Sequence, residues 1–156
     1  MQDLINEIRK LIEYTGENGT IKKEYIDLLC TKQIQAVVFN LTDYIAKKDS
    51  AKALEVLDNL LYNKEPIQMI LITLYNHVTK MFITKIAIEE NKNIALSLNL
   101  RPNQMFLTDK YKAQCRLFEK EELLKIMQDL IELDYKYKQG LIDIDIGLRT
   151  ILCGIK

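Results

Sequence analysis

Apolar residues recur along this chain at every third or fourth position, and no segment alternates apolar and polar residues as a half-buried strand does. This spacing places the apolar side chains on one side of an α-helix, which turns once in about 3.6 residues. The predicted helices begin near their first apolar residues, which are Leu4, Tyr25, Ile34, Leu54, Ile67, Ile94, Phe106, Leu123 and Ile144. Because no strand pairs, repeats or low-complexity segments interrupt them, the sequence predicts an all-α fold.

The first two predicted helices are joined by the turn Gly16-Glu17-Asn18-Gly19, and Thr20 is expected to cap the second of them. Together they span only about thirty residues, which bury too little apolar surface to offset the entropy of ordering them. We therefore expect this helix pair to lean on another part of a protein.

The longest predicted helix follows Glu65-Pro66, and proline suits a first helical turn because its missing N–H is not needed there. Eight of its apolar residues form one stripe, namely Ile67, Ile70, Leu71, Leu74, Val78, Met81, Phe82 and Ile86. Four others lie outside that stripe, namely Met69, Ile72, Tyr75 and Ile83. A helix that is apolar around most of its circumference is typical of a central or interface position. The surplus apolar surface indicates a partner.

Short breaks separate the other helices. Lys47-Lys48-Asp49 is predicted to be the turn of a helical hairpin, and the segment from Leu98 to Pro102 interrupts the pattern after a short helix near Ile94. Gly140 can adopt the left-handed conformation that closes the second-longest helix. Asp143 flanks the start of the last helix, where an acidic side chain complements the helix dipole.

Charge and cysteine content exclude several classes of protein. The chain has 22 basic and 22 acidic residues among 156, so it has no net positive field to attract nucleic acid on its own. Its three cysteines, Cys30, Cys115 and Cys153, are far apart, which predicts reduced thiols in a cytoplasmic protein. Asp3 and Glu7 interrupt the first apolar residues, so no signal peptide is expected, and the longest apolar helix is too polar to span a membrane.

No group of residues points to catalysis or to a cofactor. His77 is the only histidine and lies at helical spacing from Leu74 and Met81, so we expect it to pack or hydrogen-bond rather than act as a base or metal ligand. A zinc site would require His77 to converge with cysteine thiols, but the cysteines show no ligand spacing in the sequence. The carboxylate pairs Glu89-Glu90 and Glu121-Glu122 are predicted to lie on solvated faces, and no metal, cofactor or phosphate-binding loop is expected.

The order of these elements resembles the C-terminal region of the delta subunit of bacterial DNA polymerase III. The segment from Asp49 to Leu61 resembles the family's helix of alternating basic and leucine positions, and Asn99 stands where the family often has glycine. The other motifs that carry the resemblance are Glu65-Pro66, the L-x-L-x-P break from Leu98 to Pro102, and an L-x-x-x-D-x-x-x-K-x-G element made of Leu130, Asp134, Lys138 and Gly140. The first thirty residues look like the end of the lid domain that precedes this region.

The resemblance implies that residues 1–32 are the end of a lid domain and that residues 33–156 form a C-terminal helical collar domain. In this family the collar joins the subunits of the clamp loader, a pentameric ATPase that closes the ring-shaped sliding clamp around primed DNA. An N-terminal AAA+-like domain grips the clamp, and this chain is expected to be a C-terminal fragment without that domain. The delta subunit does not hydrolyse ATP in this family, so the resemblance also implies a non-catalytic subunit.

The expected role is a scaffold that holds the ATPase subunits and delta-prime at fixed spacing, with no direct binding of nucleic acid or membrane. Aromatic and methionine side chains are enriched at interface cores. On that ground the candidate contact residues are Tyr75, Met105, Phe106, Tyr135 and Tyr137. Structural roles are expected for Pro102, which follows the break, for Gly140, and for Asp134 and Lys138, whose spacing on one helix lets them form an ion pair.

Two other classes of protein fit the same pattern. A helical adaptor or regulatory domain unrelated to replication would show the same periodicity and the same lack of chemistry. A small helical enzyme would need His77 to converge with at least two acidic residues in one pocket.

Overall fold

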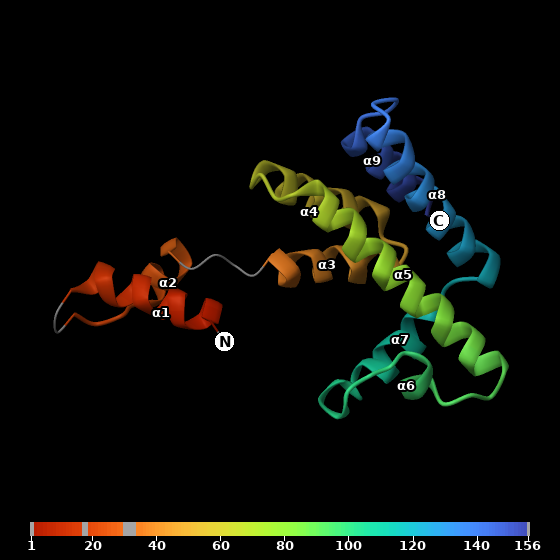
Figure 1. The fold of residues 1–156 in the computed structure, drawn as a ribbon, viewed down its shortest axis with the longest axis horizontal. Coiled ribbons are helices and arrows are strands. Elements are labelled where there is room, and N and C mark those ends of the chain that lie inside the picture. Colours follow the sequence, from red (N-terminus) through yellow and green to blue (C-terminus); the bar gives the residue numbers. More distant parts are fainter. Residues whose placement is uncertain (1, 17–18, 30–33, 156) are drawn as a thin grey trace. The chain divides into compact units, whose positions relative to one another are not determined.

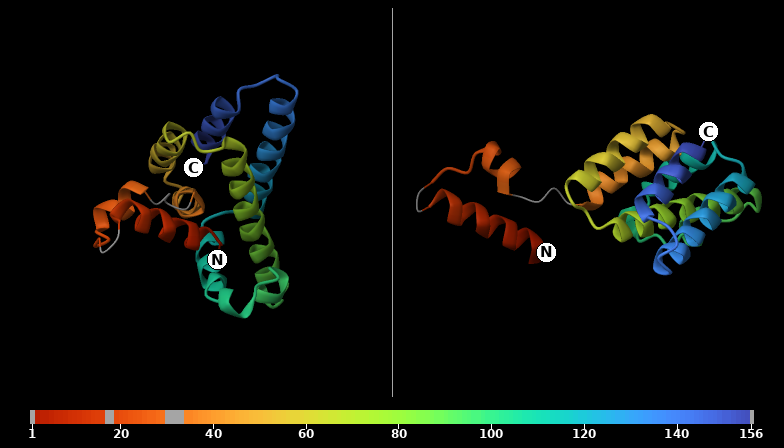
Figure 2. Two further views of the ribbon diagram at one scale, coloured as in Figure 1. Left: turned by 60° about the vertical axis from the view of Figure 1, so that its left-hand side comes forward. Right: turned by 90° about the horizontal axis from the view of Figure 1, so that it is seen from above.

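A computed structural model describes residues 2–16, 19–29 and 34–155 of the chain. All regular secondary structure among these residues is helical, with no strand among them, which confirms the all-α prediction. The chain divides into two compact units, residues 1–37 and residues 38–156. The boundary falls within the third helix, and each unit is considered by itself below (Figures 1 and 2).

The N-terminal unit contains α1 (Gln2–Thr15) and α2 (Lys23–Leu29). The rings of Tyr14 and Tyr25 meet edge to face, with their centroids 5.1 Å apart. Gly16 closes α1 in the left-handed conformation, at φ 70°. Glu17, Asn18 and Cys30 lie outside the described residues.

The prediction that Thr20 caps α2 is wrong. The backbone N–H groups of Tyr25 and Ile26 donate to the carbonyl oxygen of Lys22, so the helical hydrogen bonds start there. The helix therefore begins at Lys23, three positions beyond Thr20.

The C-terminal unit starts with the predicted hairpin, formed by α3 (Ile34–Ala46) and α4 (Ser50–Tyr62). In the turn between them, Lys48 adopts a left-handed conformation at φ 58°. Asp49 caps α4, because its carboxylate accepts a hydrogen bond of 3.1 Å from the backbone N–H of Lys52. Leu41, Leu57 and Leu60 from the two helices are fully buried.

The long helix α5 (Ile67–Glu89) packs along both α8 (Lys120–Lys138) and α7 (Leu107–Cys115). Pro66 occupies the N-cap position, one residue before the first turn in which it was predicted. The central side chains of the predicted apolar stripe are buried, whereas Met69 and Ile72 are exposed. The prediction that the apolar circumference of α5 exceeds what the chain itself covers is therefore confirmed.

The break after α6 (Ile94–Ser97) has the geometry of a Schellman motif. The N–H of Leu100 donates to Ala95 O at 2.9 Å, and the N–H of Asn99 donates to Leu96 O at 3.1 Å. Asn99 has φ 51°, a conformation open mainly to glycine and asparagine, which explains why either residue serves at this position.

Pro102 then begins a short 3-10 helix, η1 (Pro102–Gln104), ahead of α7. The apolar spacing of Phe106, Leu107 and Tyr111 predicts that Leu117 continues this helix. That prediction is wrong, because α7 ends at Cys115 and Leu117 is exposed. Phe118 is buried in its place.

The last two helices are α8 and α9 (Ile144–Gly154), which pack against each other. Gly140 has φ 72°, so it closes α8 in the left-handed conformation as predicted. Asp143 is the N-cap of α9, and its carboxylate accepts a hydrogen bond of 2.8 Å from the N–H of Asp145.

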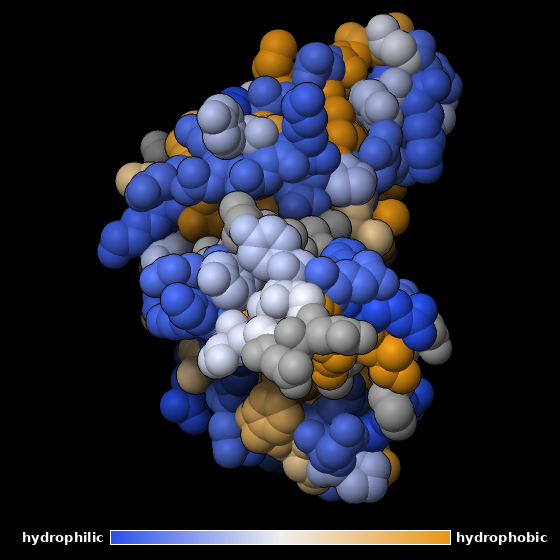
Figure 3. Space-filling view, turned by 90° about the vertical axis from the view of Figure 1, so that its left-hand side faces the viewer, coloured by the Kyte–Doolittle hydropathy of each residue, from blue (hydrophilic) through white to orange (hydrophobic). Residues whose placement is uncertain are grey.

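Polar side chains cover most of the face drawn in Figure 3, with apolar side chains in small separate groups between them.

Candidate protein interface

His77 is a core residue of the C-terminal unit. Its side chain is only 5% exposed, and its ring lies 5.4 Å from the ring of Tyr111 between centroids. Burial, with the positive charge of Lys110 as a smaller cause, lowers the pKa of His77 from 6.5 to about 4. The residue is therefore neutral at pH 7 and inaccessible, and no metal-binding cluster of His, Cys, Asp and Glu forms among the described residues.

Glu89, Glu90 and Glu122, three of the four carboxylates in the adjacent glutamate pairs, form ion pairs within the chain. Glu89 pairs with Lys120 at 3.3 Å, and Glu90 pairs with Lys92 at 2.7 Å. Glu122 has the most partners, since Lys48 Nζ donates to its two carboxylate oxygens at 3.0 and 3.2 Å. These carboxylates stabilise helix contacts and are not arranged as an acid-base pair.

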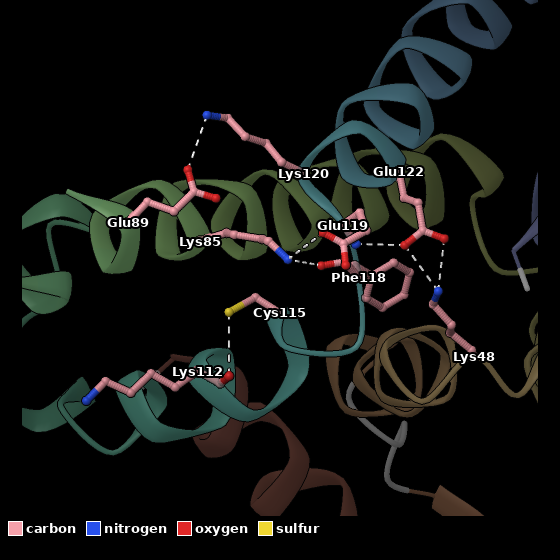
Figure 4. Close-up of polar contacts among 9 residues, drawn as sticks. All are labelled: Lys48, Lys85, Glu89, Lys112, Cys115, Phe118, Glu119, Lys120 and Glu122. Atoms are coloured by element: carbon pink, nitrogen blue, oxygen red, sulfur yellow. Dashed lines mark hydrogen bonds and ion pairs between the residues drawn. The ribbon is translucent and has the colours of Figure 1, made fainter. Parts of the chain in front are cut away.

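Figure 4 shows how these charges hold the start of α8. Glu122 also accepts a hydrogen bond of 2.7 Å from the backbone N–H of Glu119, which forms a capping box. This bond and the contact with Lys48 lower the pKa of the Glu122 carboxyl. Lys85 of α5 donates to the carbonyl oxygen of Phe118 and pairs with Glu119 at 3.7 Å. The Lys48 ammonium lies 4.8 Å from the centroid of the Phe118 ring.

Contacts at both ends show that α5 and α8 run antiparallel. The last turn of α5 meets the first turn of α8 through Glu89 and Lys120, and Gln68 Nε2 in the first turn of α5 donates to the hydroxyl of Tyr137 at 3.0 Å. Tyr137 is accordingly half-buried, as is Tyr75. Tyr135 is 61% exposed. Three of the five candidate contact residues thus lie on one helix pair.

The other two candidates lie elsewhere in the C-terminal unit. Met105 and Phe106 occupy the junction between η1 and α7 and are 50% and 71% exposed. Leu96 of α6 is also an exposed apolar side chain, in addition to Met105 and Phe106. Pro102 begins η1, and Asp134 and Lys138 form the predicted ion pair at 2.6 Å.

Several exposed apolar residues of α8 were missed from the sequence. The apolar spacing along this helix selects Leu123, Met127, Leu130, Ile131 and Tyr137. However, Ile131 is 54% exposed, whereas Ile126 and Leu133 are buried. Leu124 is also exposed. Leu124, Gln128, Ile131 and Tyr135 are separated by four, three and four residues, and this helical spacing could have signalled a second stripe, free of charged residues, on this helix.

A groove of about 540 Å³ between α8 and α9 was also missed. Apolar side chains such as Ile126, Leu133 and Ile151 line it together with charged residues of α8. The available signal was Gly147 in the last helix, since a residue without a side chain lets α9 approach α8 closely. A Cβ added at Gly147 would overlap Leu133 Cδ1 and lie 3.0 Å from Leu133 Cδ2.

Within the described part of the chain, no helix is both long enough and apolar enough to cross a bilayer. The described side chains combine internal ion pairs with exposed apolar residues on α5, α8 and the η1–α7 junction. This arrangement suits binding of another protein surface.

Comparison with known proteins assigns the fold and the family. A DNA polymerase III subunit delta from Bacillus subtilis is 28% identical over 156 residues, which is 97% of this chain and 44% of the relative. A probable DNA polymerase III subunit delta from Aquifex aeolicus is 30% identical over 139 residues, which is 86% of this chain and 39% of that protein.

A solved structure, the DNA clamp loader delta protein of Bacillus subtilis, matches with a TM-score of 0.73 and 25% identity, covering 99% of this chain and 46% of that one. The chain therefore spans less than half the length of these relatives. The family model for the C-terminal domain of the DNA polymerase III delta subunit matches residues 35–155. On this evidence the chain belongs to the DNA polymerase III delta subunit family, and residues 35–155 match the C-terminal domain of that family.

Proposed function

We propose that this chain is an assembly region of a bacterial clamp loader, which supports loading of the sliding clamp onto primed DNA during replication in the cytoplasm. The observation that carries the proposal is the family match over residues 35–155, which covers nearly all of the compact unit formed by residues 38–156. In this role the helical unit is a collar that contacts the ATPase subunits and delta-prime.

The N-terminal unit has a separate role in this proposal, as the end of a lid domain over residues 1–32, with the collar occupying residues 33–156. Its support is the apolar side of α1, where Ile5, Ile8 and Ile12 are all exposed. Only Leu11 is buried among the apolar side chains of α1 from Ile5 onward. Two short helices leave this much apolar surface uncovered when they belong to a larger helical domain.

The proposed region is non-catalytic, binds no cofactor and does not contact nucleic acid by itself. This part of the proposal is supported by the charge balance of the chain and by its internal ion pairs. The basic and acidic residues balance at 22 each, and many of the charged side chains form ion pairs within the chain, such as Lys48 with Glu122, Lys110 with Asp43 and Arg149 with Asp58. A surface without a net positive field contributes little to phosphate binding, which depends on counterion release.

Assembly is testable by mixing the chain with the clamp-loader ATPase and delta-prime subunits of the same organism. Light scattering during size-exclusion chromatography measures the mass of each species. A stoichiometric complex is expected at micromolar concentration. Separate elution of all components under those conditions would refute the proposal and would favour a helical adaptor unrelated to replication.

A further inference from the structure

Residues 91–117 form an excursion between α5 and α8, and we call this segment the flap. It contains α6, η1 and α7, which lie together at one end of the C-terminal unit, away from α4 and α9 (Figures 1 and 2). Its two ends are held close to each other, because Glu89 and Lys120 pair at 3.3 Å just outside it. Phe118, directly after the flap, is held as well, since Lys85 of α5 donates to its carbonyl oxygen. The flap can therefore move without separating α5 from α8.

Few side chains anchor the flap to the rest of the unit. The structure describes all of its residues, and four of their side chains are buried, namely Ile94, Ala95, Tyr111 and Cys115. The main packing partner of both α6 and α7 is α5. A polar contact with α3 adds to this packing, because Asp43 accepts from Lys110 at 2.6 Å and from Gln114 at 3.0 Å. A segment with so few buried contacts opens at a lower free energy than a core helix.

His77 lies beneath the flap, on the side of α5 that packs against α7. Its buried ring lies against the ring of Tyr111, and its Nε2 atom makes no hydrogen bond within the described part of the chain. A protonated ring would place a positive charge in this buried position and leave its Nε2–H without an acceptor. Protonation of His77 is therefore more costly while the flap is closed than when the ring is in water.

The groups around His77 offer little compensation for a positive charge. Lys80 of α5 and Lys110 of α7 oppose it, and the carboxylate of Asp43, which favours it, is already paired with Lys110. Burial and the nearby Asp43 raise the pKa of Tyr111, so its hydroxyl is neutral at pH 7. The helix α6 has no ionisable residue, and the buried residues of α4, α8 and α9 are all apolar. Burial, together with these charges, holds the pKa of His77 at about 4 in the closed form.

We propose that the flap is an acid-sensitive element, which separates from α5 when His77 takes up a proton while α8 and α9 stay packed. The closed form excludes the proton and the open form accepts it, so acid shifts the population towards the open form. Histidine is the side chain whose ordinary charge change falls between pH 5 and 8, and His77 is the only histidine in the chain. The inference goes beyond the proposed function and does not depend on it, because it concerns the flap alone.

Hydrogen exchange followed by mass spectrometry measures the opening of each segment of the 156-residue chain. At pH 7.5 and at pH 5.5, the amides of α8 and α9 are expected to be at least about tenfold better protected than those of α7, because the flap opens without them. After correction for the intrinsic exchange rate, the protection of α7 is expected to fall about tenfold from pH 7.5 to pH 5.5, because the exposed ring has its ordinary pKa in the open form.

His77→Leu removes the titrating ring, so the protection of α7 should then change by less than about twofold between the two pH values. His77→Gln is a second variant without a titrating group and should behave in the same way. Gln128→His on the His77→Leu background is the matched control, because it restores one histidine at an exposed position of α8. This control should not restore the pH dependence of α7. Far-UV circular dichroism shows whether each variant keeps its helices.

Three results would overturn the inference. If α7 is as well protected as α8 and α9, the flap opens only together with the whole unit. If both His77 variants keep the pH dependence of the wild-type chain, another group carries the titration. If Gln128→His restores that dependence, a histidine at any position is sufficient and the buried site beneath the flap has no special role.

Discussion

The close approach of α8 and α9 at Gly147 makes a sharp prediction about stability. A methyl group at this position would overlap Leu133 Cδ1 and come within 3.1 Å of Leu133 Cγ, and Leu133 is buried. Overpacking of this kind costs about 1–3 kcal/mol. Replacing a helical glycine by alanine returns about 1 kcal/mol through helix propensity, so Gly147→Ala should lower the free energy of unfolding by about 0–2 kcal/mol.

Gly154 in the same helix provides the control, because a Cβ there meets no atom within 4 Å. Gly154→Ala should be neutral or stabilising by up to about 1 kcal/mol. Urea unfolding followed by circular dichroism measures both variants. If Gly147→Ala is as stable as Gly154→Ala, the close packing of the two helices is refuted.

A double-mutant cycle tests whether overlap with Leu133 causes the destabilisation expected for Gly147→Ala. Leu133→Ala alone should cost about 2–5 kcal/mol, because it leaves a cavity in the core. In the double variant the new methyl group of Gly147→Ala enters that cavity, so the two costs should fall short of additivity by at least about 1 kcal/mol. Additivity within about 0.5 kcal/mol would show that the two positions do not share this space.

Three further changes test other parts of the fold. Lys48→Met removes a donor to Glu122, so the pKa of the Glu122 carboxyl should rise towards its ordinary value in an NMR titration, while the effect on stability stays below about 1 kcal/mol because both groups are partly exposed. The pKa of His77 is lower in the folded chain than in the unfolded chain, so stability should fall as the pH drops from 6.5 to about 4, by up to about 3 kcal/mol, and His77→Leu should flatten this window in urea titrations at a series of pH values. Asn99→Val should lower stability by about 1–2 kcal/mol in thermal unfolding because a β-branched residue resists a φ of 51°, whereas Asn99→Gly should stay close to the wild-type chain.

Local signals in the sequence were sufficient for most helix ends. Gly140, Asn99 and the turn from Lys47 to Asp49 each require or favour a special backbone conformation, and each occupies the predicted place. Such features depend on residues close in sequence, so periodicity and turn chemistry identify them. Thr20 shows the limit of this reasoning, because several nearby residues could begin α2 and the backbone uses the carbonyl oxygen of Lys22.

The face that a helix presents to its neighbours depends on tertiary packing and was predicted less well. Both Leu130 and Ile131 satisfy helical spacing, yet only Leu130 is buried, because the packing direction of α8 is set jointly by α5 and α9. Leu117, which the same kind of spacing assigned to α7, lies beyond the end of that helix and is exposed. Among the candidate contact residues, apolar character alone could not separate the exposed Tyr135 from the half-buried Tyr75 and Tyr137.

The anchoring of α8 has a consequence for association. Its first turn is fixed to the α3–α4 turn through Lys48 and to α5 through Lys85, and its last turn is fixed to α5 through Tyr137. A helix held at both ends cannot rotate about its own axis without breaking contacts on more than one neighbour. The exposed apolar side chains of α8, among them Ile131 and Tyr135, are therefore already held in one orientation, so binding of a partner to this helix requires little ordering of the backbone and loses correspondingly little conformational entropy.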